Sequence, residues 1–163
     1  MTRNARSSQP FDAPQIPVQI KLAAAWSSLM FLYIYVDYLV LYKPGHLDGI
    51  LAGKIWEFDI SQTFMTAAFL SMTLPSLAIV LSVTLPARAA RATDLVVAAL
   101  FVPYSIFNAA GETWIVFFGV SIGLELVLLA FILRTAWTWP RRPARAQAEP
   151  VAVTERLRRK AHA

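Results

Sequence analysis

The chain has 163 residues, enough for one domain, and 57% of them are hydrophobic, a larger share than soluble globular proteins carry. Its net charge is +5 and it contains no cysteine, which removes disulfides and thiolate metal sites. No basic face with interleaved aromatic residues accompanies the positive charge, so we expect no nucleic-acid partner. The composition instead favours a protein whose main partner is the lipid bilayer.

Four apolar runs are long enough, or nearly so, to cross a hydrocarbon core, which takes about 18 or more residues. They cover residues 20–42, 61–85, 93–110 and 113–137. None shows the period-2 alternation of a barrel strand, so we predict a transmembrane helix in each. The first run is longer than the apolar region of a signal peptide, and no cleavage site follows it. We therefore treat it as a retained signal anchor.

These runs predict an all-α fold, a four-helix transmembrane bundle over residues 20–139. The segment between the first two runs contains Pro44 at a suitable helix start, an apolar stripe, and Gly53 as a suitable helix end. We expect a short interfacial helix there.

Two polar segments flank the predicted bundle. Residues 1–19 hold three prolines and show no lasting hydrophobic period, which is typical of a disordered tail. Residues 140–163 carry seven basic residues against two acidic ones. Such a cluster next to a membrane is attracted to anionic lipid by about 1 kcal/mol per basic residue. We expect anionic lipid to be the partner of this tail.

The basic residues also predict an orientation, because Lys and Arg accumulate in cytoplasmic loops. With four crossings, thirteen of the fifteen Lys and Arg residues fall on one side, and only Lys43 and Lys54 fall on the other. This distribution predicts a multi-pass protein of the bacterial inner membrane with both termini in the cytoplasm.

Asp37 and Glu125 carry carboxyl groups well inside the predicted helices. At a rise of 1.5 Å per residue, Asp37 would lie about 9 Å below the outer membrane surface and Glu125 about 18 Å below it. An ionised carboxylate at a helix centre costs about 2.5–3.5 kcal/mol, so each group needs a partner, a proton or a water-filled cavity. A neutral, hydrogen-bonded acid is the cheapest state for Glu125.

Helical spacing supplies neighbours for both carboxyl groups. Tyr33 lies one turn from Asp37, and Ser121 lies one turn from Glu125. Asn108 and Tyr104 occupy the third predicted helix at a depth close to that of Asp37. The hypothetical polar site therefore comprises Asp37, Tyr33, Asn108, Tyr104, Glu125 and Ser121.

Two interpretations of this polar set stay open. In one, it lines an outward-facing pocket that binds or transports a proton or a small cation, since intramembrane ionisable residues are usually functional. In the other, the same groups only join the helices through hydrogen bonds worth about 0.6 kcal/mol each.

Small residues suggest a second possible function. Gly119 and Gly123 form a GxxxG pattern in the fourth run, and Ala67 and Ser71 form a small-xxx-small pair in the second. Both patterns favour close helix packing, either inside the bundle or between protomers. The chain could then be a structural or accessory subunit of a homo-oligomer or a larger membrane complex.

Several kinds of chemistry lack their usual residues. The only histidines, His46 and His162, are far from any second ligand in the sequence, which disfavours a metal or haem centre. The chain also lacks a phosphate-binding glycine loop, a GxSxG pattern and an HExxH pattern. We expect no cofactor and no enzymatic activity.

Three stretches carry a resemblance to a known family: YIYVDYLVLYKPG, LAGKI with ISQTFM, and ELVLLAFILRTAWTW. They resemble a family of small bacterial four-helix membrane proteins of unknown function, in which the first helix ends in a Tyr-Ile-Tyr-x-Asp pattern and the last carries a glutamate. Tyr33, Tyr35, Asp37 and Glu125 match that pattern. The resemblance covers about residues 20–139 and implies the topology, but it implies no mechanism.

Overall fold

The computed structural model describes residues 16–139. The elements are α1 (Val18–Val40), α2 (His46–Leu51), β1 (Lys54–Ile55), β2 (Phe58–Asp59), α3 (Gln62–Thr84), α4 (Ala87–Phe107) and α5 (Ile115–Trp137). Four of these helices are long and apolar enough to cross a membrane, which confirms the predicted all-α, four-helix fold. Most of the predicted N-terminal tail and all of the basic tail lie outside the described residues, although α1 begins at Val18, within the segment predicted to be disordered.

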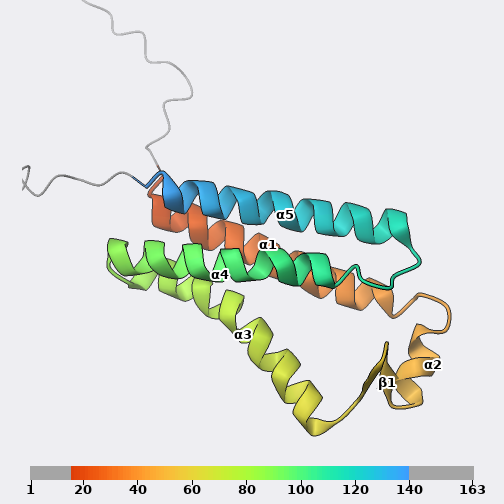
Figure 1. The fold of residues 1–163 in the computed structure, drawn as a ribbon. Helices are drawn as coiled ribbons and strands as arrows, with labels where there is room; N and C mark the ends of the chain where they lie inside the picture. The colour runs from red at the N-terminus through yellow and green to blue at the C-terminus, as the bar shows by residue number, and fades with distance from the viewer. Residues whose placement is uncertain (1–15, 140–163) are drawn as a thin grey trace, which may run out of the picture.

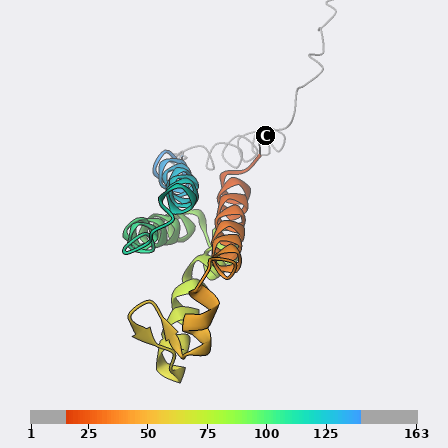
Figure 2. The ribbon, with the colours of Figure 1, turned by 90° about the vertical axis from the view of Figure 1, so that its right-hand side faces the viewer.

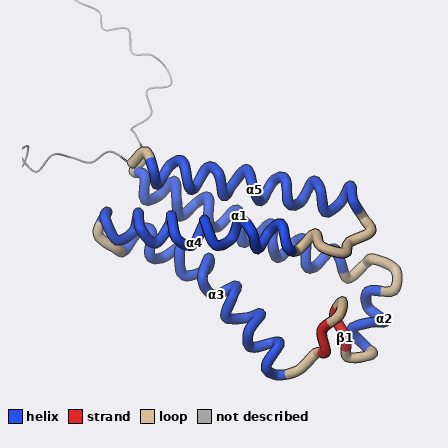
Figure 3. The backbone as a smooth tube through the Cα atoms, viewed as in Figure 1, coloured by secondary structure: helices blue, strands red, loops and turns tan. Residues whose placement is uncertain are grey.

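The long helices run up and down between two ends of the molecule (Figure 1). We call one the terminal end, because it holds residues 16–17, the α3–α4 turn at residues 85–86, and residues 138–139. The other is the loop end, with residues 41–61 and 108–114. Helices α1, α4 and α5 lie side by side, whereas α3 diverges from them toward the loop end (Figure 3). Figure 2, viewed from the loop end, shows α2 and the hairpin on the side where α3 diverges.

The core lies between α1, α4, α5 and the second half of α3, and it is formed by large apolar side chains and alanines. Leu22, Trp26 and Leu29 of α1, with Leu129 and Ile132 of α5, are fully buried. The buried alanines are Ala25, Ala78, Ala90, Ala98 and Ala136. Lipid tails are as apolar as leucine, so membrane helices associate through close packing, which small residues allow. The alanines therefore let the helix backbones approach one another around the larger side chains.

Helix α3 is packed over only part of its length. Its buried residues are Pro75, Ala78 and Ser82, all in its second half. Residues 62–70 are exposed apart from Phe64, which is half-buried. Pro75 removes a backbone hydrogen bond and favours a bend, and it stands close to where the packing begins. The loop-end half of α3 therefore has almost no side chain against the rest of the chain.

A small antiparallel hairpin at the loop end is absent from the sequence predictions. Lys54 pairs with Asp59 and Ile55 with Phe58, around a two-residue turn that begins with Trp56. Trp56 has a φ of 52°, the left-handed conformation that such tight turns demand and that large side chains seldom adopt. The preceding helix α2 occupies the position predicted for a short helix.

The indole of Trp56 joins the hairpin to the α4–α5 turn. Its ring lies 6.2 Å from that of Phe107 and 5.8 Å from that of Phe58, measured between centroids. A Cβ atom on Gly111 would lie 2.9 Å from Nε1 of Trp56, so the contact requires a glycine there. Gly111 also has a φ of 79°, which glycine adopts without strain.

Helix α4 begins six residues earlier than predicted, at Ala87 instead of residue 93. Pro86, with φ fixed by its ring, stands at the N-cap. The prediction was wrong because Arg88 and Arg91 suggested a loop. The guanidinium of Arg91 instead donates from Nε to the carbonyl oxygen of Ala136 over 2.9 Å and from Nη2 to that of Trp137 over 3.2 Å. The helix therefore uses the charge of Arg91 to satisfy carbonyls at the end of α5.

Candidate functional site

Glu125 is buried at the centre of α5, with only 2% of its surface exposed. It lies ten residues from the start of the helix, about 15 Å at the usual helical rise. Its Oε2 atom is buried and has no hydrogen-bond partner among the described residues. The Ser105 hydroxyl and the Asp37 carboxyl both lie near enough to interact with it. We call Tyr33, Tyr104, Ser105 and Glu125 the Glu125 cluster.

Two hydroxyl groups connect α1 and α4 within the Glu125 cluster. The Tyr33 hydroxyl lies 2.8 Å from Oγ of Ser105, and either atom can donate. The Tyr33 ring lies 6.0 Å from that of Phe101 and 6.3 Å from that of Tyr104. Because this aromatic packing fixes the Tyr33 ring, its hydroxyl is held beside Ser105 in the middle of the bundle.

Asp37 occupies a different environment from Glu125. It is exposed, because α1 ends at Val40 and places Asp37 in its last turn. Counted from the end of α1, Asp37 lies three residues deep, or about 4.5 Å at helical rise, where the predicted helix gave about 9 Å. Its carboxyl nevertheless lies within electrostatic range of Glu125 and Tyr104. Of the two members of the predicted set on α1, Asp37 is therefore closer to the loop end than Tyr33.

The other members of the predicted set are only partly brought together. Asn108 is the exposed C-cap of α4, one turn after Tyr104. Ser121 is almost buried, but its hydroxyl donates to the Phe117 carbonyl oxygen over 2.7 Å. That hydroxyl hydrogen is therefore not available to Glu125, although the two residues share a face of α5.

A second buried carboxyl, Asp94 of α4, was absent from the predicted site. Asp94 is fully buried, and its Oδ1 accepts a hydrogen bond from Nε1 of Trp26 over 2.8 Å. Oγ of Ser82 lies 2.7 Å from the same oxygen and 2.6 Å from the carbonyl oxygen of Ala78. Oδ2 of Asp94 is buried and has no hydrogen-bond partner in the part of the chain that the structure describes. We call Trp26, Ser82 and Asp94 the Asp94 cluster, which joins α1, α3 and α4.

The sequence contained a signal for Asp94 that the predicted helix start obscured. The residues of α4 that are buried are Ala90, Asp94, Val97, Ala98, Phe101 and Ser105. Their spacings of three, four and seven residues describe one helical face. Counting that period back from Phe101 places Asp94 on the buried face, and a helix start at Ala87 instead of residue 93 places it about two turns inside the helix.

The small-residue motifs lie outside the bundle contacts. Gly119 and Gly123 are exposed, and a Cβ added to either would have no neighbour within 4 Å in the chain. Ala67 is exposed too, while the Ser71 hydroxyl bonds to the carbonyl oxygen of Ala68. The sequence left open whether these glycines pack inside the bundle or between protomers. Gly119 and Gly123 do not pack against another helix inside the bundle.

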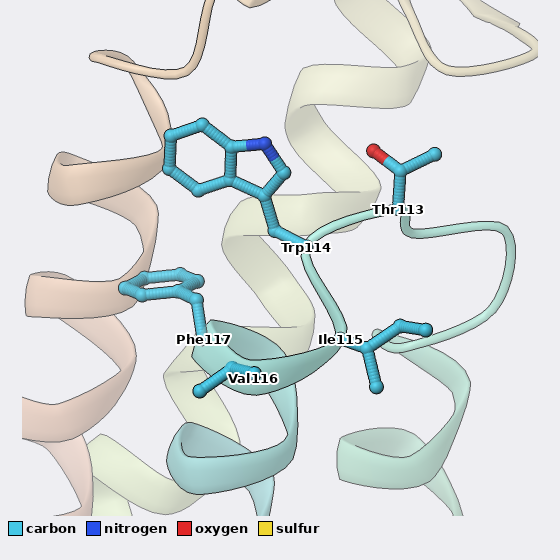
Figure 4. A pocket seen from close by; sticks show the side chains of 5 residues that line it. All are labelled: Thr113, Trp114, Ile115, Val116 and Phe117. Atoms are coloured by element: carbon cyan, nitrogen blue, oxygen red, sulfur yellow. The ribbon is translucent and has the colours of Figure 1, made fainter.

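A shallow hollow at the start of α5 is separate from both carboxyl clusters. It is lined by Thr113, Trp114, Ile115, Val116 and Phe117, which are consecutive in sequence. Their side chains point in different directions in Figure 4, with Trp114 and Phe117 on one side and Ile115 on the other. None of the five titrates, so this hollow offers no acid–base chemistry. Within residues 16–139, no three histidine, aspartate or glutamate side chains gather as metal ligands.

The four apolar helices and the carboxyl groups buried between them define a multi-pass membrane protein. The chain belongs to DUF6326, a family of unknown function whose model matches residues 17–144. No curated protein and no solved structure matches the chain.

Proposed function

We propose that the chain is a multi-pass protein of a bacterial inner membrane whose Glu125 cluster binds a proton or a small cation in the service of transport. One observation carries this proposal: the unpartnered Oε2 of Glu125, buried at the middle of a membrane-spanning helix. A carboxyl at that depth is costly unless it is neutralised, so intramembrane acids usually mark ion or proton sites. The proposal assigns the chain no catalytic role.

The proposed ligand enters from the loop end. Asp37 is exposed in the last turn of α1, near enough to Glu125 and Tyr104 for an electrostatic interaction. The hydroxyls of Tyr33 and Ser105 lie deeper, so oxygen atoms are available from the loop end to the bundle centre. Oxygen ligands of this kind suit a proton or a hard cation.

We propose that the loop end of the bundle is external and that the terminal end, with the start of α1 and the end of α5, faces the cytoplasm. Arg88, Arg91 and Arg134 lie in the terminal halves of α4 and α5, whereas Lys43 pairs with Glu112 at the loop end. This distribution follows the rule that Lys and Arg accumulate on the cytoplasmic side.

Flux through liposomes containing the full chain tests the proposal. A pH dye inside the vesicles reports proton entry under an imposed gradient, and parallel sodium and potassium gradients at equal pH report a cation. We expect Glu125→Gln and Asp37→Asn to reduce the flux toward that of protein-free vesicles. Glu57→Gln, in the exposed hairpin turn, is the control and should behave as wild type. Wild-type flux in both test variants, or no flux from the wild-type chain, would contradict the proposal.

A structural or accessory role is the second candidate, and the bare surface at Gly119 and Gly123 favours it. Small residues on a lipid-facing surface allow the close approach of another helix. If the chain associates through this surface, Gly119→Leu combined with Gly123→Leu should shift its size in mild detergent from oligomer to monomer. A wild-type chain that is already monomeric in lipid would count against this role.

A further inference from the structure

The hydrogen bonds of the Asp94 cluster need one more hydrogen than the ionised side chains supply. A serine hydroxyl has one hydrogen to donate, and an indole has one. The Ser82 oxygen has two oxygen neighbours, the Ala78 carbonyl at 2.6 Å and Oδ1 of Asp94 at 2.7 Å. One hydrogen cannot make a full hydrogen bond to both. A proton on Asp94 supplies the missing one, because Oδ1–H can then donate to Ser82 while Ser82 donates to Ala78.

Within residues 16–139, the surroundings of Asp94 offer no cation in place of that proton. Helix α3 has no titratable residue, and on α1 the side chain that faces Asp94 is the neutral Trp26. Arg91, one turn earlier on α4, gives its guanidinium to the two α5 carbonyls. Lys21 of α1 and Arg134 of α5 are exposed. A fully buried carboxylate without a paired cation carries a large desolvation cost, which a bound proton removes.

The Asp94 cluster is also separate from the Glu125 cluster. Along α4, Asp94 and Ser105 are eleven residues apart, or about 16 Å. The intervening layer contains the buried apolar side chains of Leu29, Phe101 and Leu129. Asp94 is only seven residues from the start of α4, about 10 Å, so water at the terminal end is its nearer source of protons.

We propose that Asp94 is a second proton-binding site, independent of the Glu125 cluster, where one proton shared by Asp94 and Ser82 joins α4 to α3. Uptake forms an O–H bond on the Asp94 carboxyl with a proton taken from water, and release returns that proton to water. No other bond is made or broken. When the proton leaves, the single Ser82 hydroxyl hydrogen can be donated fully to either the Ala78 carbonyl or Asp94, but not to both. The contact between α3 and α4 therefore weakens.

Infrared spectroscopy of the full chain in lipid nanodiscs tests the proposal directly. A protonated carboxyl group has a C=O stretching band that a carboxylate lacks. The measurement uses the Glu125→Gln background, so that a failure of the proposed transport function does not affect it. At neutral pH we expect this band to be present, to vanish on Asp94→Asn, and to persist on the control Asp48→Asn, at an exposed position of α2. Removing the hydrogen-bond partner with Ser82→Ala should move the band without abolishing it.

The pH dependence of unfolding gives a second, independent readout. The folded bundle holds this proton and the unfolded chain has released it, so the stability provided by Asp94 is lost as the pH rises. In the interval where only the folded state is protonated, the unfolding equilibrium constant should rise up to about tenfold per pH unit relative to Asp94→Asn. That variant keeps a hydrogen on a neutral side chain, and its fold is checked by circular dichroism.

Two results would overturn the proposal. One is an unchanged carboxyl band in a folded Asp94→Asn variant, which would mean that Asp94 is ionised in the wild type. The other is parallel pH profiles of unfolding for the wild type and Asp94→Asn, which would mean that Asp94 binds no proton on folding.

Discussion

Replacing Arg91 by alanine should loosen the terminal end of the bundle. The guanidinium makes two hydrogen bonds to the last carbonyls of α5, from Nε to Ala136 and from Nη2 to Trp137. These carbonyls belong to the group that an α-helix leaves without internal partners. Arg91→Ala removes both donors and also the positive charge that faces the negative end of the helix dipole.

The size of the effect follows from these two contributions. A hydrogen bond from a charged donor is worth about 1.5–3 kcal/mol, but Arg91 is half-buried, so water compensates for part of its loss. The charge near the helix end adds about 0.3–1 kcal/mol. We therefore expect Arg91→Ala to lower the free energy of unfolding by about 2 kcal/mol. Arg91→Lys keeps the charge but loses the two-pronged geometry, so about half of that loss should remain.

Reversible unfolding in mixed detergent micelles, followed by circular dichroism, measures this change. Arg88→Ala is the matched control, because Arg88 is exposed three residues earlier on the same helix. Its free energy of unfolding should stay within about 0.5 kcal/mol of wild type, as is usual for a surface substitution. Equal losses for Arg88→Ala and Arg91→Ala would refute the assignment of the capping role to Arg91.

Two further substitutions probe the loop end and the core. Gly111→Ala places a Cβ atom on a left-handed backbone and against the indole of Trp56. It should lower the free energy of unfolding clearly more than Gly53→Ala, where φ is also positive but no atom is near and about 1 kcal/mol is expected. Equal losses for the two variants on thermal unfolding would show that the indole moves aside. Leu129→Ala should lower the free energy of unfolding by about 2–4 kcal/mol because the side chain is fully buried. Leu124→Ala should lower it much less, because that side chain is half exposed toward lipid. Similar losses for the two variants in the same micelle titration would contradict the buried position of Leu129.

The sequence was sufficient for the long helices because membrane crossing demands continuous apolar length, which a single chain displays directly. The ends of those helices depend on local interactions that composition does not reveal. Arg88 and Arg91 suggested a loop, because a charge inside a helix is expensive until it has an acceptor. For Arg91 those acceptors are the α5 carbonyls, which are distant in sequence.

The candidate site was predictable in part for a similar reason. Glu125 stands out in an apolar run, and the predicted set already contained Tyr33, as a neighbour of Asp37, and Tyr104, at a similar depth. Ser105 was missed because a serine in a helix is unremarkable until a partner such as Tyr33 is beside it. Asp37 was predicted about 9 Å from the end of its helix, but α1 ends at Val40 and leaves Asp37 exposed in its last turn. Depth along a helix can be counted from sequence, whereas burial depends on which neighbours are present.

The sparse packing of the loop-end half of α3 has a consequence for the bilayer itself. The tilt of a membrane helix is set by its neighbours and its interfacial aromatic anchors, and residues 62–70 have few neighbours in the chain. Phe58 and Phe64, stacked with ring centroids 5.7 Å apart, remain as anchors at this end. The angle of α3 therefore follows the thickness of the surrounding lipid more closely than the angles of α1, α4 and α5 do. Lipid chain length then becomes a variable that acts on the position of the loop-end half of α3 relative to the other helices.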